Sequence, residues 1–237
     1  MKAMILAAGL GTRLKPFTNT HPKALALVNG KPVLQRNIEY LAQFGIKDII
    51  VNVHHFADQV KDALQKNNGY GSRVTVSDES DEILETGGGV KKASGFFTGE
   101  SSFVVMNVDI LTDMDIRLMI RQHKSMNSLA TLAVTNRITN RYFLFDELGN
   151  LCGWKNEKTN EQKICKESDK YTQKAFSGIS VISPAIFPMI KFKGKFTLVE
   201  LYLHLAKTNA INAFDHSTSK FIDVGKPENI LIANQIF

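Results

Sequence analysis

The stretch LAAGLGTRLKPFTNTHPKAL, Leu6 to Leu25, decides how the rest of the chain is interpreted. It continues the apolar run MKAMILAA (1–8), which has the length of a buried strand, and then turns on Gly9 and Gly11. Glycine accepts a positive φ and lets backbone N–H groups come close to an anion. Several cationic side chains follow within the same stretch. This order predicts a strand, a glycine turn and a site for a small anion.

The composition also favours a small anionic ligand. The 237 residues are 43% hydrophobic and 22% charged, which suits one sizeable core, and the formal net charge is +6. The basic residues form no continuous run, and the densest groups are Lys91–Lys92 and the scattered lysines from Lys155 to Lys174. Because nucleic-acid surfaces combine basic blocks with aromatic residues, we expect no nucleic-acid partner and a polyphosphate ligand instead.

Cysteine content and hydropathy narrow the class of protein further. Cys152 and Cys165 are the only cysteines, too few for a disulfide framework or a cysteine zinc cluster. No apolar run approaches the ~18 residues expected of a membrane span. We therefore expect free thiols, no membrane partner and a cytoplasmic location.

Strand and helix patterns alternate up to residue 135. This rhythm predicts an α/β fold with a mostly parallel sheet and helices on both of its faces. Strands are expected at 1–8, 48–53, 72–78, 102–109 and 129–135. Helices are expected at 31–45 and 55–69, over GGGVKKASGFF, and over DIRLMIRQHKSM with Asp113 or Asp115 as its cap.

The pattern changes after Thr135. YFLFDELGNLCGWKN predicts a hairpin that turns over 146–150, and 175–183 predicts a strand with an internal glycine. An amphipathic helix at 196–209, two short strands and a closing helix complete the chain. Without a linker or repeat, we expect one domain over 1–237, with the later residues on one side of the sheet.

Three phosphate-binding motifs can be compared with the glycine turn. No P-loop pattern is present, and the dinucleotide fingerprint fails at its third glycine, where Leu14 stands. A glycine pair after a strand also suits an ordinary tight turn. The whole string, however, resembles the signature LAAGxGTRLxPxTxxxPKxL of the sugar-1-phosphate nucleotidyltransferases. Its fixed positions are matched by Leu6, Ala7, Ala8, Gly9, Gly11, Thr12, Arg13, Leu14, Pro16, Thr18, Pro22, Lys23 and Leu25.

This resemblance implies a Rossmann-like α/β/α fold with a mixed, mostly parallel sheet and a small sugar-binding β lobe. It implies a nucleotide-binding half over about 1–135 and a sugar-phosphate-binding half over about 136–237. Arg13 and Lys23 become the catalytic residues, on the phosphates where charge builds during transfer. The implied nucleotide-binding residues are Ala8, Gly9, Gly11, Thr12, Arg13, Lys23, Thr86, Gly87 and Gly88.

The resemblance also implies a divalent cation, Mg²⁺, held by two aspartates. Asp109 ends the strand FVVMNVD, although Val108 replaces the usual glycine before it. Asp223 lies in FIDVGKPENI, which resembles the late aspartate motif of the family. Carboxylate oxygens are the hard ligands that magnesium prefers. A single aspartate at a strand end also suits a turn or a helix cap.

Two more segments resemble the family's substrate contacts. ILETGGGV (83–90) is similar to its base-recognition loop, where three glycines open a helix. FSGISVISP (176–184) is similar to its sugar-facing strand. The implied sugar-binding residues are Asn107, Gly178 and Glu200, of which Glu200 also suits an exposed helix position.

A third segment of the family, its Glu-Lys-Pro sequence, has no recognisable counterpart. In the family, this segment carries a lysine that binds phosphate. In this chain, Lys155, Lys166 and Lys174 are open alternatives for that lysine. Trp154 is interpreted as a core or lobe residue rather than as a stacking platform.

The implied reaction converts a nucleoside triphosphate and a sugar 1-phosphate into a nucleotide sugar and pyrophosphate. The nucleotide is UTP or GTP, and the sugar is of the N-acetylmuramate or mannose type. Two alternatives stay open: a cytidylyltransferase that acts on phosphocholine, and a non-catalytic regulatory module that binds nucleotide sugars. The retained Lys23, Asp109 and Asp223 favour the enzyme over the module.

Overall fold

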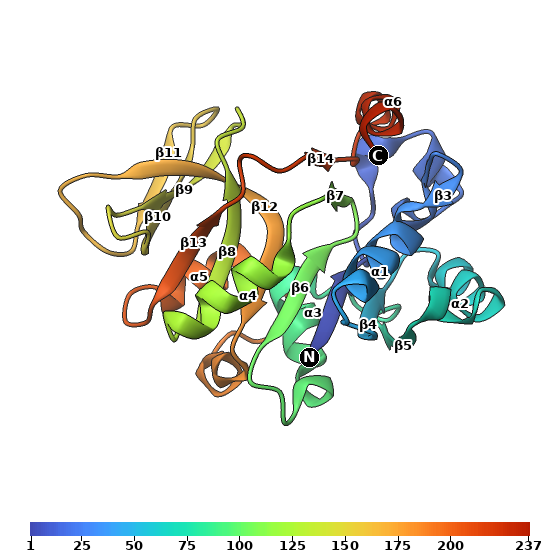
Figure 1. Ribbon diagram of the computed structural model, residues 1–237, viewed down its shortest axis with the longest axis horizontal. Coiled ribbons are helices and arrows are strands. Elements are labelled where there is room, and N and C mark those ends of the chain that lie inside the picture. Colours follow the sequence, from blue (N-terminus) through green and yellow to red (C-terminus); the bar gives the residue numbers. More distant parts are fainter.

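The computed structural model describes residues 1–237 as one ten-stranded mixed sheet, two short two-stranded ribbons and six α-helices (Figure 1). The strands of the large sheet are β1 (Lys2–Leu6), β4 (Asp48–Val53), β5 (Arg73–Asp78), β6 (Phe103–Asn107), β8 (Ala130–Thr135), β9 (Arg141–Phe145), β10 (Leu151–Asn156), β11 (Glu161–Ile164), β12 (Thr172–Ile182) and β13 (Ile211–Asp215). The ribbons pair β2 (Leu27–Val28) with β3 (Lys31–Pro32), and β7 (Ile110–Thr112) with β14 (Phe221–Asp223). The helices are α1 (Val33–Gln43), α2 (Ala57–Lys66), α3 (Glu85–Lys92), α4 (Ile116–Ser125), α5 (Leu198–Leu205) and α6 (Pro227–Ile236).

The first part of the sheet is parallel, in the order β5-β4-β1-β6. Side chains of β1 alternate between its two faces, as a strand requires. Ala3 and Ile5 join the core on one face, and Met4 and Leu6 join the core on the other. Because both faces are buried, this strand is a continuous apolar run rather than an alternating one.

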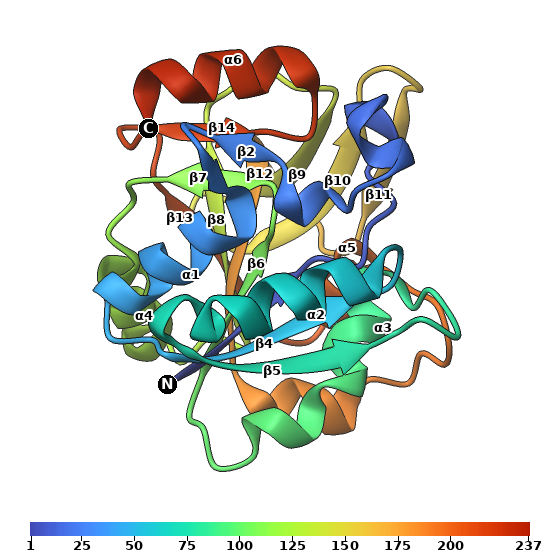
Figure 2. The same ribbon diagram turned by 90° about the vertical axis from the view of Figure 1, so that its right-hand side faces the viewer.

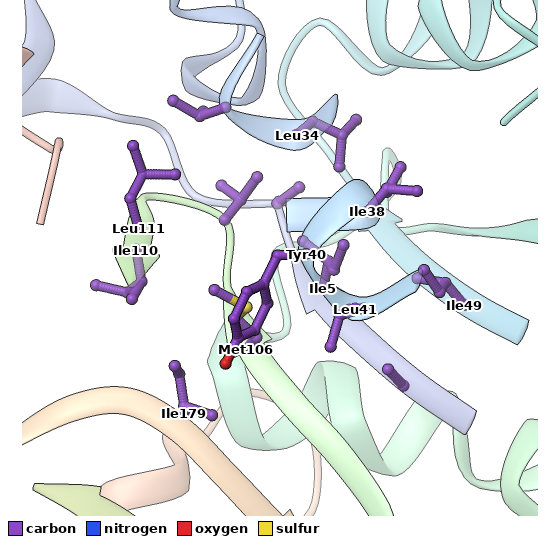
Figure 3. Packing of buried hydrophobic residues seen from close by; sticks show 14 of the residues in the cluster. Ile5, Leu34, Ile38, Tyr40, Leu41, Ile49, Met106, Ile110, Leu111 and Ile179 are labelled. Carbon is purple, nitrogen blue, oxygen red and sulfur yellow. The ribbon is translucent and has the colours of Figure 1, made fainter. Parts of the chain in front are cut away.

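Helices cover both faces of the parallel strands. The stripe of α1 that includes Leu34, Ile38 and Leu41 packs on Ile5 and Ile49, as Figure 3 shows. Figure 2 shows α1 and α2 on one side of β4, and α6 beside β14. Helices α3 and α5 contribute to the core on the opposite face. The predicted α/β/α layering is therefore confirmed.

The later residues extend the same sheet instead of forming a separate layer. Strand β12 runs antiparallel to β6 and β8 over its second half, and pairs with β9 over its first three residues. A bulge between Phe176 and Ser180 interrupts the pairing of β12 with β8. The antiparallel strands β9, β10 and β11 then form a lobe at the edge of the sheet, on the left in Figure 1.

Local side-chain contacts explain where two of these elements begin. The predicted hairpin is β9–β10, and Asp146 closes its turn by accepting the N–H groups of Leu148 and Asn150 at 3.0 and 2.8 Å. Of the two possible caps of α4, Asp115 is the actual one, since it accepts the N–H of Arg117 at 3.0 Å.

None of the helices combines the length and apolar character that crossing a membrane requires.

Candidate active site

The glycine turn and the ends of the parallel strands surround one cavity of about 570 Å³. This position, outside the carboxyl ends of the strands, is where open α/β sheets bind their ligands. The cavity, called here the nucleotide cavity, is lined by Leu6, Ala8, Gly9, Leu10, Gly11, Thr12, Arg13, Lys23, Asn52, Ile83, Glu85, Thr86, Asn107, Asp109, Arg141 and Lys195. All six residues predicted from the glycine turn as nucleotide ligands therefore lie in one wall.

Close packing explains why the turn needs its second glycine. Gly11 has a φ of 63°, and a Cβ there would lie 2.9 Å from Thr18 Cγ2 and 3.0 Å from Lys23 Cβ. The hydroxyl of Thr18 also donates to the carbonyl of Gly11 at 2.9 Å. The chain thus folds back on its own turn, and this brings the Lys23 ammonium beside Gly9.

Two ion pairs join the cations of the turn to the two predicted metal ligands. Lys23 Nζ lies 2.9 Å from Asp109 Oδ2, and both side chains are largely buried, with 16% and 8% of their surface exposed. Arg13 Nη2 lies 3.5 Å from Asp223 Oδ2 in a more open position. The structure therefore brings together four residues that the sequence singled out separately.

The two aspartates meet around Gly225. The N–H of Val224 donates to the carbonyl of Asp109 at 2.8 Å, which fixes the late segment against the end of β6. A Cβ on Gly225 would lie 2.7 Å from Asp223 Oδ1 and 3.1 Å from Asp109 Oδ2. Only glycine leaves room at this point for both carboxylates and the neighbouring Arg13.

This donor set fits a divalent cation. Asp109 and Asp223 supply hard oxygen ligands, and no group of three or more His, Cys, Asp or Glu side chains forms there. Magnesium is commonly bound by one or two carboxylates together with water and substrate phosphates. Two carboxylates beside a cavity of about 570 Å³ that could hold substrate phosphates are suited to that arrangement.

A second cavity of about 680 Å³, called here the lobe cavity, lies against the antiparallel strands. It is lined by Arg13, Arg137, Thr139, Asn140, Arg141, Tyr142, Phe143, Trp154, Asn156, Lys158, Phe176, Val199 and Asp223. Trp154 lies on β10 of the lobe, as predicted, where it packs against the core and lines this cavity. The sequence did not predict that Arg137, Arg141 and Lys158 line a site, because no motif contains them. The pairing of β9 with β10 and β12 brings them to this cavity.

Two predicted sugar ligands lie side by side at the bulge of β12. Gly178 has a φ of 72°, and a Cβ there would lie 2.7 Å from Asn107 Nδ2 and 3.1 Å from Ile110 Cγ1. Asn107 lines the nucleotide cavity at the end of β6. Gly178 lets these two strands approach closely, so its backbone lies directly behind the site.

The three glycines of the ILETGGGV segment are placed differently from the prediction. The N–H groups of Gly87 and Gly88 both donate to the carbonyl of Phe196, at 2.9 and 3.2 Å. A Cβ on Gly87 would lie 2.5 Å from the Phe196 ring. Both glycines are buried and neither lines the nucleotide cavity. They pack the helix start against the 192–197 loop, whereas Thr86 does line the cavity.

Glu200 also has another task than the predicted one. Its carboxylate accepts the N–H and the hydroxyl of Thr197, each at 2.8 Å, in a capping box at the start of α5. These hydrogen bonds hold the pKa of Glu200 below its ordinary value. Glu200 lines neither cavity, so the structure does not bring it together with Asn107 and Gly178.

The three lysines left open by the sequence lie outside both cavities. Lys155 Nζ pairs with Glu157 at 3.2 Å, and Lys174 Nζ lies 2.5 Å from Asp215 Oδ2. Lys166 lines a separate cavity beside the end of α5. None of the three is placed as a phosphate ligand at this site.

A buried polar chain that the sequence did not reveal supports the glycine turn. Asn52 Oδ1 accepts the N–H of Ala7 at 2.7 Å, and Asn52 Nδ2 donates to Glu79 Oε1 at 2.9 Å. Burial raises the pKa of Glu79, and its Oε2 is buried without a hydrogen-bond partner. The end of β1 is therefore held by a side chain from β4 at the point where the turn begins.

Comparison with known proteins agrees with this geometry. The family model described as "Nucleotidyl transferase" matches residues 2–143, which is more than half of the chain. The chain belongs to the nucleotidyl transferase family. Two similar members are N-acetylmuramate alpha-1-phosphate uridylyltransferases. The one from Caulobacter vibrioides is 44% identical over 109 residues, and the match covers 45% of each chain. The one from Neisseria meningitidis is 29% identical over 225 residues, and the match covers 95% of this chain and 93% of the relative.

A solved structure also matches the whole chain. HddC from Yersinia pseudotuberculosis, complexed with GMP-PN, superposes with a TM-score of 0.80 and 28% identity, covering 100% of this chain and 99% of HddC. The predicted fold class and membership of the nucleotidyl transferase family are confirmed.

Proposed function

We propose that this nucleotidyl transferase family member converts a nucleoside triphosphate and a sugar 1-phosphate into a nucleotide sugar and pyrophosphate. One observation carries the proposal. Arg13 and Lys23, on the glycine turn, are each paired with an aspartate where the nucleotide cavity meets the lobe cavity. The relatives named after uridylyl transfer to N-acetylmuramate 1-phosphate support the same class of reaction.

The chemistry needs charge neutralisation more than proton transfer. An oxygen of the sugar phosphate forms a new bond to the α-phosphorus of the nucleotide, and the bond from that phosphorus to the leaving pyrophosphate breaks. The attacking oxygen is already anionic, so no general base is required. The difficulty is to hold two anions together, and preorganised cations lower that barrier most effectively. Arg13 and Lys23 are the side chains that supply this charge.

Asp109 and Asp223 are the residues that would hold Mg²⁺ in this proposal. When bound, the ion would supply further positive charge to the phosphate oxygens. Gly225 keeps the space between the two carboxylates open, which supports their joint use. Asn107 and the backbone at Gly178 are proposed to face the sugar.

The proposed nucleotide is UTP or GTP, and the proposed sugar is of the N-acetylmuramate or mannose type. Uridylyl transfer is named for the two relatives above, and HddC was solved with a guanine nucleotide analogue. The lobe cavity presents four cations and one carboxylate, which suits an anionic acceptor. Phosphocholine carries a quaternary ammonium group beside its phosphate, so this excess of cations favours a sugar 1-phosphate over phosphocholine.

A substrate matrix tests the proposal. Pyrophosphate release is measured for ATP, CTP, GTP and UTP against glucose, mannose and N-acetylmuramate 1-phosphates and phosphocholine. We expect turnover with at least one sugar 1-phosphate and no turnover with phosphocholine. The Lys23→Ala variant should stay folded and release pyrophosphate at a greatly reduced rate. Tight nucleotide binding without turnover on any acceptor would instead support the regulatory module.

A further inference from the structure

Only two side chains line both cavities: Arg13 and Arg141. The nucleotide cavity is built by the glycine turn and the parallel strands, and the lobe cavity by β9, β10 and β12. If the triphosphate occupies the first and the acceptor the second, the reacting phosphates meet at their boundary. Both arginines therefore lie where the proposed reaction takes place.

The two arginines differ in what they contact within the protein. Arg13 is paired with Asp223 at 3.5 Å. Arg141 is exposed, and its guanidinium has neither a hydrogen-bond partner nor an ion-pair partner. Arg137, a third arginine of the lobe cavity, donates to the carbonyl of Phe176 at 2.9 Å and lies over the Phe221 ring. Of these three arginines, only Arg141 therefore has all of its guanidinium N–H groups free to bind a substrate.

The backbone of Arg141 is fixed although its side chain is unpaired. Arg141 begins β9, where it is opposite Asn156 of β10. Its neighbour Tyr142 is buried, and the Tyr142 hydroxyl accepts the N–H of Thr139 at 2.9 Å. A guanidinium carried by a paired strand can bind a phosphate in a two-pronged geometry.

The other cations that could bind the acceptor's phosphate are either engaged by protein groups or lie away from the boundary of the two cavities. Lys155 and Lys174 are engaged with acidic side chains on the lobe, and Lys166 lies at another cavity. Lys158 lines the lobe cavity but lies on an exposed turn beyond β10, and it does not line the nucleotide cavity. Arg141 is the one unpaired cation placed at the boundary.

We propose that Arg141 binds the phosphate of the sugar 1-phosphate acceptor and holds it beside the α-phosphate of the nucleotide. This assignment rests on the proposed function of the site. It makes Arg141 a substrate-binding residue, supplied by the lobe, that complements Arg13 and Lys23 from the glycine turn.

The test compares Arg141→Ala and Arg141→Lys with the wild-type protein. The matched control is Lys155→Ala, which removes a cation from the paired strand β10 without altering either cavity. KM and kcat are measured for the fastest sugar 1-phosphate in the substrate matrix, and nucleotide affinity is measured separately by calorimetry without acceptor.

We expect Arg141→Ala to raise the acceptor KM at least ~10-fold and to lower kcat/KM about 100-fold, since a binding cation is lost. Nucleotide affinity should stay within about twofold, and Arg141→Lys should be intermediate because it keeps the charge but loses the fork. Lys155→Ala should match the wild type.

An acceptor KM within about twofold of the wild type in Arg141→Ala would overturn the assignment. So would a loss of nucleotide affinity as large as the loss of acceptor affinity. If the wild type turns over none of the acceptors, the proposed function fails. Calorimetric binding of glucose, mannose and N-acetylmuramate 1-phosphates to wild type and Arg141→Lys then still tests Arg141.

Discussion

Lys23 Nζ and Asp109 Oδ2 lie 2.9 Å apart, and the pair joins the glycine turn to the end of β6. Both groups are largely buried, so each neutralises a charge that would be costly alone. The proposed phosphate ligand and the proposed metal ligand are therefore held in register before any substrate binds. Arg13 and Asp223 repeat this arrangement at 3.5 Å on the more open side.

Replacing either carboxylate should damage catalysis, and Asp109→Asn should also lower stability because it leaves the largely buried Lys23 without its counter-charge. We expect Asp109→Asn and Asp223→Asn each to lower kcat at least ~10²-fold, which is the low end of losses for removing one electrostatic stabiliser. The measurement is magnesium-dependent pyrophosphate release. Asp62→Asn on the exposed face of α2 is the control, and it should have no effect. Near-normal rates in both site variants would show that the aspartates do not hold the metal.

Adding one methyl group at Gly225 tests the space between the aspartates. We expect Gly225→Ala to lower activity at least ~10-fold while the melting temperature changes little, because the new Cβ would displace the ends of Arg13 and Asp223. Gly95→Ala is a matched control, since a Cβ there meets nothing within 4 Å. Full activity in Gly225→Ala would mean that the two carboxylates need not approach each other.

Gly87 should behave in the opposite way. A Cβ at Gly87 would lie 2.5 Å from the Phe196 ring and 2.9 Å from the backbone of Thr197. We expect Gly87→Ala to lower the free energy of unfolding by about 1–3 kcal/mol, as overpacking of a core does. Urea denaturation measures this change against Gly95→Ala. Unchanged stability combined with weakened nucleotide binding would restore the predicted role of Gly87 in base recognition.

Two buried histidines should make the fold sensitive to acid. Burial lowers the pKa of His123 and of His216 to about 4, from an ordinary value of 6.5. Between these values the unfolded chain binds a proton at each histidine and the folded chain does not. The free energy of unfolding therefore falls as the pH falls from 6.5 to 4, by up to about 3 kcal/mol for each histidine.

Urea denaturation at several pH values measures this dependence. His216→Gln should reduce the slope of the free energy of unfolding against pH by about 1.4 kcal/mol per pH unit, which corresponds to one proton. The exposed His55→Gln serves as the control and should leave the slope unchanged. A wild-type stability that does not change between pH 6.5 and 4.5 would contradict the burial of the neutral imidazoles.

The polar chain behind the glycine turn gives a fifth prediction. Asn52→Ala leaves the N–H of Ala7 without its acceptor, so we expect a loss of about 1–3 kcal/mol in the free energy of unfolding and weaker nucleotide binding. Glu79→Gln should be neutral or slightly stabilising at pH 7, because burial disfavours the charged carboxylate and raises its pKa. An equal loss in both variants would show that Glu79 acts as a carboxylate.

Much of the nucleotide half could be predicted from the sequence because its signals are local. The central parallel strands β1, β4 and β6 are buried on both faces, so they appear in the sequence as mainly apolar runs. The glycine turn likewise carries most of the proposed nucleotide ligands within one short stretch, and these residues line one cavity. The sequence also predicted that Asp113 or Asp115 caps α4, and the structure decides for Asp115.

The remaining features depend on contacts between distant segments. Gly87 and Gly88 resemble a ligand-binding turn in sequence, and only the approach of Phe196 explains why glycine is needed there. From the sequence alone, Glu200 could have been a sugar ligand. The structure instead shows it in a capping box with Thr197 at the start of α5. Arg141 has no motif, because its importance arises where two cavities meet.

The long strand β12 has a mechanical consequence for the proposed reaction. This strand, bulged between Phe176 and Ser180, pairs with β9 of the lobe at one end and with β6 of the parallel strands at the other. Continuous backbone therefore joins the two halves. In the proposed reaction, the spacing between the lobe cavity and the nucleotide cavity then depends on the pairing of this one strand.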